Sequence, residues 1–196
     1  MYSVLKYTVL ILLVTLAYSS IYAQGWIRNY GNNQYSGYDV VQATNGDFIS
    51  CGGGDGTAYY QRVNSAGDTL WSNNLDFSIG GNLALSLVLM QDGSLVSVNQ
   101  KGNNTVIVQL NAAGQLIGQN EWNWSTSVYP SRIIKADTGF FVLGAINSST
   151  GSDLDLFLAK TDANGDTLWM KTYGGANNET ASDLSLDANG GLILAG

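Results

Sequence analysis

The chain of 196 residues contains no histidine. Catalysis by Ser–His–Asp or Cys–His groups and zinc sites with histidine ligands are therefore excluded from these residues. A single cysteine, Cys51, is present, so no internal disulfide can form. We interpret Cys51, which lies between Ser50 and Gly52, as a small core residue, with a reactive thiol as the alternative.

Positive charge is also scarce. The chain has 8 lysines and arginines against 15 aspartates and glutamates, which gives a formal net charge of −7. An acidic protein repels phosphate backbones, so we expect no nucleic-acid partner. The acidic residues are spread along the chain, a distribution typical of a solvated surface.

A long apolar run is missing as well. The run at residues 8–17 is shorter than the roughly 20 apolar residues that a transmembrane helix needs. Lys6 precedes it and Ala23 offers a small residue before a cleavage point, so residues 1–23 are predicted to be a secretory signal peptide. The run is short for the alternative, an uncleaved membrane anchor. We expect a secreted or cell-surface protein with no membrane insertion after cleavage.

No stretch after residue 23 has helical periodicity. The chain is rich in glycine, with 24 residues, and 45% of it is apolar, with many aromatic residues. Glycine-rich sequences are either disordered or built from short strands joined by tight turns, and the apolar content favours strands.

An internal repeat organises these strands. The segment NSAGDTLW at 64–71 returns as DANGDTLW at 162–169, with a degenerate copy, NAAGQLIG, at 111–118. The glycines of these copies are 47 and 51 residues apart. A second marker runs in phase at 45–49, 92–96, 138–142 and 189–193, and a third, WIRNYG at 26–31, returns as WMKTYG at 169–174. Three markers with one period indicate a repeat architecture.

Each unit contains four runs typical of strands. In the clearest copy they cover residues 131–136, 140–146, 154–161 and 167–173, with Gly-containing turns between them. Both faces of the third run are largely apolar, which suits a strand packed on both sides. Four antiparallel strands in 47–51 residues predict an all-β fold, a β-propeller of four-stranded blades. A β-prism or an irregular sandwich is the alternative.

The repeat frame gives the expected domain organisation. Residues 24–196 form a partial β-propeller with repeats at about 26–71, 72–118 and 119–169, followed by an incomplete repeat at 170–196. We therefore expect a truncated fragment of a longer propeller. Residues 26–31 match the last strand of a unit, and we hypothesise that they complete the final blade of a closed ring.

The markers together resemble the propeller-like repeats of secreted proteins from Bacteroidetes-type bacteria. The resemblance covers residues 26–196 and is best at 160–175 and 183–196; Gly118 departs from it where Trp71 and Trp169 stand. It implies a cell-surface repeat protein, often with a C-terminal sorting domain for type IX secretion, which this sequence does not contain.

Two other families share fragments of the pattern. Residues 163–169 look like the blade repeat of quinoprotein-like propellers, but the adjacent cysteines often found in active members are missing. Residues 89–96 look like part of a bulb-type lectin repeat. The alternating polar residues of the lectin's sugar site are not supplied by Val96, Val98 and Gln100, so sugar binding is not carried over.

Two clusters are candidate sites. Trp122, Trp124 and Tyr129 lie outside the repeat pattern and could stack on a sugar or a partner, while packing between blades is the alternative. The oxygen-bearing residues Asp162, Asn164 and Asp166 are spaced like the start of a calcium loop. The other copies have Asn64, Asn111 and Gln115 at these positions, so a hairpin turn is the favoured interpretation.

No catalytic residue set and no cofactor are expected. The sequence favours a non-enzymatic repeat scaffold that is secreted or held at the cell surface and binds an unidentified protein or ligand. A carbohydrate-binding, lectin-like propeller with a glycan partner is one alternative. An accessory domain of an enzyme whose active site lies beyond residue 196 is the other.

Overall fold

The computed structural model describes residues 27–30, 35–77, 82–124, 126–148 and 153–196. The predicted signal peptide, 1–23, lies outside these ranges. The described residues form fourteen β-strands and no helix, so none of them belongs to a helix that could span a membrane. The all-β prediction is confirmed.

The strands form three four-stranded antiparallel sheets and one two-stranded sheet, each made of consecutive strands. The first sheet contains β1 (Ser36–Gln42), β2 (Phe48–Gly54), β3 (Thr57–Val63) and β4 (Thr69–Leu75). The second contains β5 (Asn82–Leu89), β6 (Leu95–Lys101), β7 (Asn104–Leu110) and β8 (Leu116–Trp122). The third contains β9 (Val128–Lys135), β10 (Phe140–Asn147), β11 (Leu154–Thr161) and β12 (Thr167–Tyr173).

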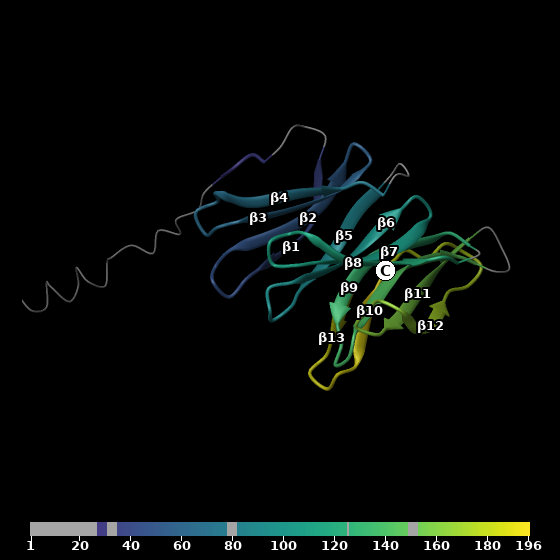
Figure 1. Cartoon of the computed structure of the whole chain (residues 1–196). Helices are drawn as coiled ribbons and strands as arrows, with labels where there is room; N and C mark the ends of the chain where they lie inside the picture. Colours follow the sequence, from purple (N-terminus) through teal and green to yellow (C-terminus); the bar gives the residue numbers. More distant parts are fainter. Residues whose placement is uncertain (1–26, 31–34, 78–81, 125, 149–152) are drawn as a thin grey trace, which may run out of the picture.

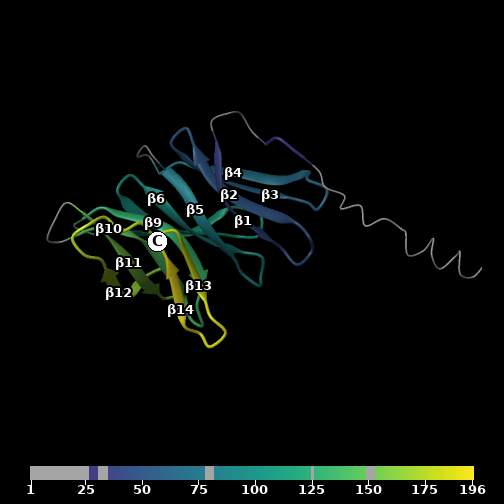
Figure 2. The same cartoon turned by 180° about the vertical axis from the view of Figure 1, so that it is seen from behind.

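The fourth sheet pairs β13 (Asp183–Leu186) with β14 (Leu192–Ala195). The sheets follow one another in chain order like the sectors of a fan, a propeller-like arrangement (Figure 1). From behind, the β13–β14 pair lies beside the third sheet, where β13 contacts β9 (Figure 2). The strands nearest the common centre are the first of each sheet, since β5 contacts both β1 and β9.

The strand predictions for the clearest repeat match the third sheet closely. The observed strand β9 begins at Val128, three residues before the expected start, and runs through Pro130. A proline is tolerated there because β9 is an edge strand, paired only with β10, and because the register shifts next to Pro130.

One marker copy is out of register by one residue. The first turn of the third sheet closes with the amide of Ala136 on the carbonyl of Gly139, whereas the first sheet uses Ala43 and Asp47. The first turn of the third sheet is therefore one residue shorter than the first turn of the first sheet. Phe140, and not Phe141 as the sequence alignment implies, occupies the place of Phe48.

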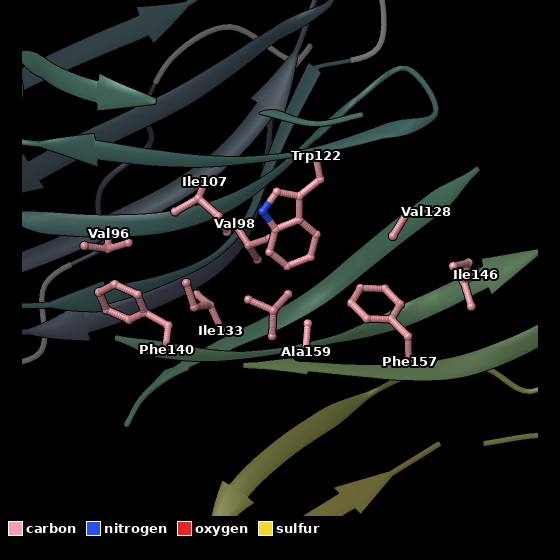
Figure 3. Close-up of a cluster of buried hydrophobic side chains, with 11 residues drawn as sticks. Val96, Val98, Ile107, Trp122, Val128, Ile133, Phe140, Ile146, Phe157 and Ala159 are labelled. Atoms are coloured by element: carbon pink, nitrogen blue, oxygen red, sulfur yellow. The ribbon is translucent and has the colours of Figure 1, made fainter. Parts of the chain in front are cut away.

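The sheets are held together by apolar layers between them. One cluster joins the first and second sheets and includes Ile49, Tyr60 and Leu87. A second joins the second and third sheets; its side chains are shown in Figure 3, where Trp122 reaches from β8 toward the third sheet. On β11, Phe157 faces this cluster while Leu158 faces a third cluster with Leu184. The two-sided packing expected of β11 is confirmed.

The last strands of the first and second sheets also rest on a turn of the following sheet. Trp71 Nε1 donates to the carbonyl of Ala112 at 3.2 Å, and Asn73 Nδ2 donates to that of Gly114 at 2.8 Å. One repeat later, Trp122 Nε1 donates to the carbonyl of Gly165 at 3.0 Å. The turn of one repeat is thus a docking point for the repeat before it.

Residues 27–30 lie on the first sheet in the same way. Tyr30 donates its hydroxyl to the carbonyl of Gly67 at 2.7 Å, and Arg28 contacts Asp68 at 3.4 Å. Gly67 is the repeat equivalent of Gly165, so Tyr30 takes the role that Trp122 has on the third sheet. Residues 27–30 belong to no strand, so the hypothesis that residues 26–31 act as the last strand of a blade stays a prediction, as does closure of a ring. Trp26 and Gly31 lie outside the described residues.

Replacing Gly114 with alanine tests this turn contact. Gly114 has a φ of +77°, and an added Cβ would lie 2.6 Å from the Trp71 ring. We expect the free energy of unfolding to fall by about 2 kcal/mol, because the left-handed conformation penalises alanine and the indole must move. Chemical denaturation measures the change. Gly175→Ala, where an added Cβ meets nothing within 4 Å, is the control; an equal loss in both variants would contradict the account.

Candidate functional site

One residue position on the first strand of each sheet brings polar side chains together at the centre of the fold. Asp39, Ser86, Arg132 and Asp183 are equivalent in register, because each pairs with the fourth residue of the next strand: Cys51, Val98, Leu143 and Ala195. We call these four residues the axial cluster. In the first three sheets a register shift adjoins this position and aims its side chain inward.

The axial cluster is tied together by charge. Asp39 Oδ2 accepts hydrogen bonds from Ser86 Oγ at 2.9 Å and from the amide of Leu87 at 3.0 Å. It also accepts one from Arg132 Nη1 at 3.0 Å. Arg132 Nε lies 3.1 Å from Asp183 Oδ1, an ion contact without the geometry of a directed hydrogen bond. The cluster therefore links all four sheets, and its charged groups are paired with one another.

A second feature is a pocket of about 610 Å³ between the described residues Asn29, Tyr30 and Tyr35 and the first sheet. Its lining consists of three tyrosines, three asparagines, one glutamine, one serine and one threonine. We call it the tyrosine pocket, after Tyr30, Tyr35 and Tyr59. None of the described residues that line it carries a formal charge.

The side chains of the tyrosine pocket are positioned by contacts with one another. The rings of Tyr35 and Tyr59 lie 5.2 Å apart, tilted by 42°. Asn74 Nδ2 donates to the Tyr35 hydroxyl at 3.3 Å, and Gln61 Nε2 donates to Thr69 Oγ1 at 2.9 Å. Burial raises the pKa of Tyr59, with a smaller opposing effect from its hydrogen bond to Ser72. The Tyr59 phenol therefore stays protonated and able to donate a hydrogen bond.

The pocket is a departure from the repeat. The face of the first sheet that carries Tyr59 and Gln61, which we call the front face, is opposite to the one that packs on the second sheet. Equivalent positions in the second sheet hold Val106 and Val108, both fully buried against the first sheet. Those in the third hold Phe157 and Ala159. The front face of the first sheet therefore carries Tyr59 and Gln61 where the second and third sheets carry apolar residues packed against a neighbouring sheet.

The aromatic residues predicted as a ligand site have mixed placements. Trp122 is 4% exposed and stacks on Trp124, with ring centres 5.4 Å apart and planes at 10°. Trp124 is half-buried and also lines a surface groove of about 370 Å³. Tyr129 is half-buried on β9, opposite Ala145, and no ring contact within the described part of the chain ties it to the tryptophans. The burial of Trp122 agrees with the alternative interpretation, packing between sheets.

The residues considered as a calcium loop form the hairpin turn between β11 and β12. Asp162 Oδ1 accepts the amides of Asn164 and Asp166, both at 2.9 Å. Asn64 makes the same two bonds in the first sheet, so the role belongs to the turn and not to aspartate. Asp166 accepts a hydrogen bond from Asn120 at 2.6 Å. Across the described ranges, no group of three or more His, Cys, Asp or Glu side chains lies close enough to hold a metal ion.

Cys51 is 1% exposed and lies in the layer between the first and second sheets. Burial, followed by the nearby Asp39 carboxylate, raises the pKa of its thiol. Since the thiolate is the reactive form, we expect no labelling of the folded chain by a thiol reagent up to about pH 9. Labelling should follow unfolding as urea is added. Rapid labelling in native buffer would contradict this placement.

The sequence interpretation missed both the axial cluster and the tyrosine pocket. The axial residues differ in chemical type and lie about one repeat apart, so no motif connects them. An alignment of the repeats by strand register would have placed them in one column. The same alignment would have placed Tyr59 and Gln61 in columns where the other repeats have apolar residues. That difference is a signal by which the pocket could have been found.

Comparison with known proteins identifies the fold and no family. No family model matches the chain, and no curated protein matches it. Among solved structures, it is similar to a protein of unknown function from Bacteroides caccae, with a TM-score of 0.57 and 16% sequence identity. The match covers 84% of this chain and 54% of that one, so the chain spans about half the length of its structural neighbour. At this identity the similarity supports the propeller-like, all-β repeat fold alone.

Proposed function

We propose that this protein is an exported repeat scaffold that binds a ligand or partner and catalyses no reaction. The observation that carries the proposal is the lining of the tyrosine pocket. It is rich in hydrogen-bonding groups but has no carboxylate, amine, guanidinium or thiol among its described residues. Such a lining can bind a molecule, but it lacks the acid–base groups that catalysis usually needs near neutral pH.

The charged groups elsewhere support the same proposal. Asp39 and Arg132 of the axial cluster are engaged with each other, and Asp162 closes a turn with its own backbone amides. The Cys51 thiol is buried. Each of these four described residues therefore has a structural role.

Export and origin belong to the proposal as well. Residues 1–23 have the pattern of a secretory signal, and the repeat markers resemble those of Bacteroidetes-type secreted and cell-surface proteins. The Bacteroides structural neighbour is compatible with this origin. Sorting by type IX secretion is the route that the resemblance implies.

A turnover assay tests the non-catalytic proposal. The purified chain is mixed with chromogenic substrates for glycosidases, esterases, phosphatases and peptidases. We expect rates equal to those of the substrates alone. Variants Arg132→Met and Tyr59→Val identify contaminants, because a contaminating enzyme is unaffected by them. Activity that falls in either variant would overturn the proposal.

Carbohydrate binding is the second candidate function. The uncharged, hydroxyl- and amide-rich lining of the tyrosine pocket favours it over recognition of a charged ligand.

A further inference from the structure

We infer that a groove between the first and second sheets binds an extended peptide segment of a partner protein that carries a basic side chain. The groove has a volume of about 620 Å³ and lies at the end of the sheets where their first turns are found, so we call it the first-turn groove. Its lining includes Asn45 and Arg62 of the first sheet and Leu89, Met90, Asp92 and Ala112 of the second. The inference rests on the proposed function, and it names the class of partner and a site apart from the tyrosine pocket.

The second and third sheets form an equivalent groove that a side chain bridges. Gln109 on β7 donates from Nε2 to the carbonyl of Ala163 at 2.8 Å, so it spans the two sheets. This smaller groove has a volume of about 380 Å³. In the first-turn groove the same repeat position holds Arg62, which instead pairs with Asp47 of its own sheet. Among the described residues, the first-turn groove therefore lacks the bridge that narrows its equivalent, although a sheet is present on each side of it.

The most buried charged group of the groove, Arg62, is already neutralised. Its Nε and Nη2 both lie 2.9 Å from Asp47 Oδ2, which also accepts a hydrogen bond from Asn45 Nδ2 at 2.9 Å. The side chains of Arg62 and Asp47 are 16% and 10% exposed. Because the two charges cancel, this part of the groove selects neither an anion nor a cation.

Asp92 gives the groove its net charge. Its side chain is exposed, and no ion pair within the described ranges includes it. Hydrogen bonds from the hydroxyl and the amide of Ser94 hold the pKa of the Asp92 carboxyl below its usual value, so the group is ionised at neutral pH. One uncompensated carboxylate, on a chain with a net charge of −7, favours a cationic group in the partner.

The rest of the lining favours a peptide over a saccharide. Leu89 and Met90 are half-buried and offer apolar surface to a side chain, and methionine adapts its shape to different ligands. Thr44 and Gln91 are exposed, and their hydroxyl and carboxamide can pair with the polar groups of a peptide backbone. None of the described lining residues is aromatic, whereas an aromatic ring is the usual apolar surface for a sugar. The volume lies within the range of roughly 300–1,000 Å³ of small-ligand sites, so a short segment fits and a folded domain does not.

The test uses a library of labelled heptapeptides that have arginine at the centre and vary elsewhere, and a matched library with glutamate at the centre. Peptides selected on the full chain are titrated by fluorescence anisotropy at low and moderate salt. We expect binding from the arginine library alone, and tighter binding at low salt. Asp92→Asn should weaken this binding roughly tenfold and reduce its salt dependence. The variant should fold, because Asn45 holds the equivalent position in the first sheet and its Oδ1 likewise accepts the amide two residues on.

Thr44→Lys is a second variant, directed at the groove and not at the carboxylate. Thr44 is exposed, so a lysine is tolerated there, and it adds a cation to the lining that offsets the charge of Asp92. We expect the selected peptides to lose most of their affinity for this variant, with the circular dichroism spectrum unchanged.

Asp137→Asn is the matched control. It removes the same charge from the lining of the smaller groove, so peptide binding should be unchanged. An equal loss in Asp92→Asn and Asp137→Asn would overturn the site, and equal binding of the two libraries, or binding of neither, would overturn the class of partner. None of these results involves turnover, so a failure of this inference is distinct from a failure of the non-catalytic proposal.

Discussion

Replacing Leu87 with alanine is expected to lower the free energy of unfolding by about 2–5 kcal/mol. Leu87 is 3% exposed and lies in the apolar layer between the first and second sheets. Its removal leaves a cavity that neighbouring side chains such as Ile49 and Val106 cannot fill without moving. Urea denaturation, with the slope of the transition checked for constancy, measures the loss.

Val40 is the control for Leu87, because it occupies the same repeat position in the first sheet. Both residues directly follow the axial position in their strands, but Val40 is 59% exposed. We therefore expect Val40→Ala to change the free energy of unfolding by less than about 0.5 kcal/mol. A loss as large as that of Leu87→Ala would mean that the front face of the first sheet is covered in solution.

Replacing Arg132 with methionine is expected to lower the free energy of unfolding by about 2–3 kcal/mol. The variant keeps the apolar stem but leaves the Asp39 carboxylate, whose side chain is 12% exposed, without its charged partner. The Arg132 side chain is 35% exposed, so water offsets part of the loss that a fully buried pair would show. Thermal and urea denaturation at low and moderate salt measure the effect.

Arg28→Met is the matched control for this prediction. Arg28 and Asp68 are also an ion pair, at 3.4 Å, but their side chains are 52% and 63% exposed. Exposed pairs contribute little, so we expect a change below about 1 kcal/mol. Equal effects of the two arginine variants would show that the axial cluster has no special role in stability.

Much of the fold could be predicted because its signals are local. Turn glycines such as Gly67 and Gly165 mark hairpins through backbone conformations that other residues avoid, and both have positive φ angles in the structure. Successive residues of a strand point to opposite faces, and both Phe157 and its neighbour Leu158 are apolar, which indicates a strand packed on two sides. The structure confirms this, because the two residues lie in different apolar clusters. The one-residue shift at Phe140 was missed because the turn before it is only one residue shorter, a difference smaller than the variation in length between repeats.

The candidate sites were harder to predict because they depend on contacts between repeats. Trp122 looks like a ligand-stacking residue in the sequence, yet its side chain is buried because the third sheet packs over it (Figure 3). Asp39 and Arg132 are 93 residues apart and meet only because the inner strands converge. Tyr59 sits in an ordinary strand pattern, and only its strand register reveals that its equivalents are apolar.

The convergence of the inner strands is the central structural claim, and a double-mutant cycle between Asp39 and Arg132 tests it most directly. These residues belong to the first and third sheets, with β5 of the second sheet in contact with both of their strands. Sheets stacked in a straight row would keep them apart. Unfolding free energies of Asp39→Asn, Arg132→Met and the double variant give the coupling. We predict a coupling of about 1–3 kcal/mol; additive effects, within about 0.5 kcal/mol, would contradict the propeller-like arrangement.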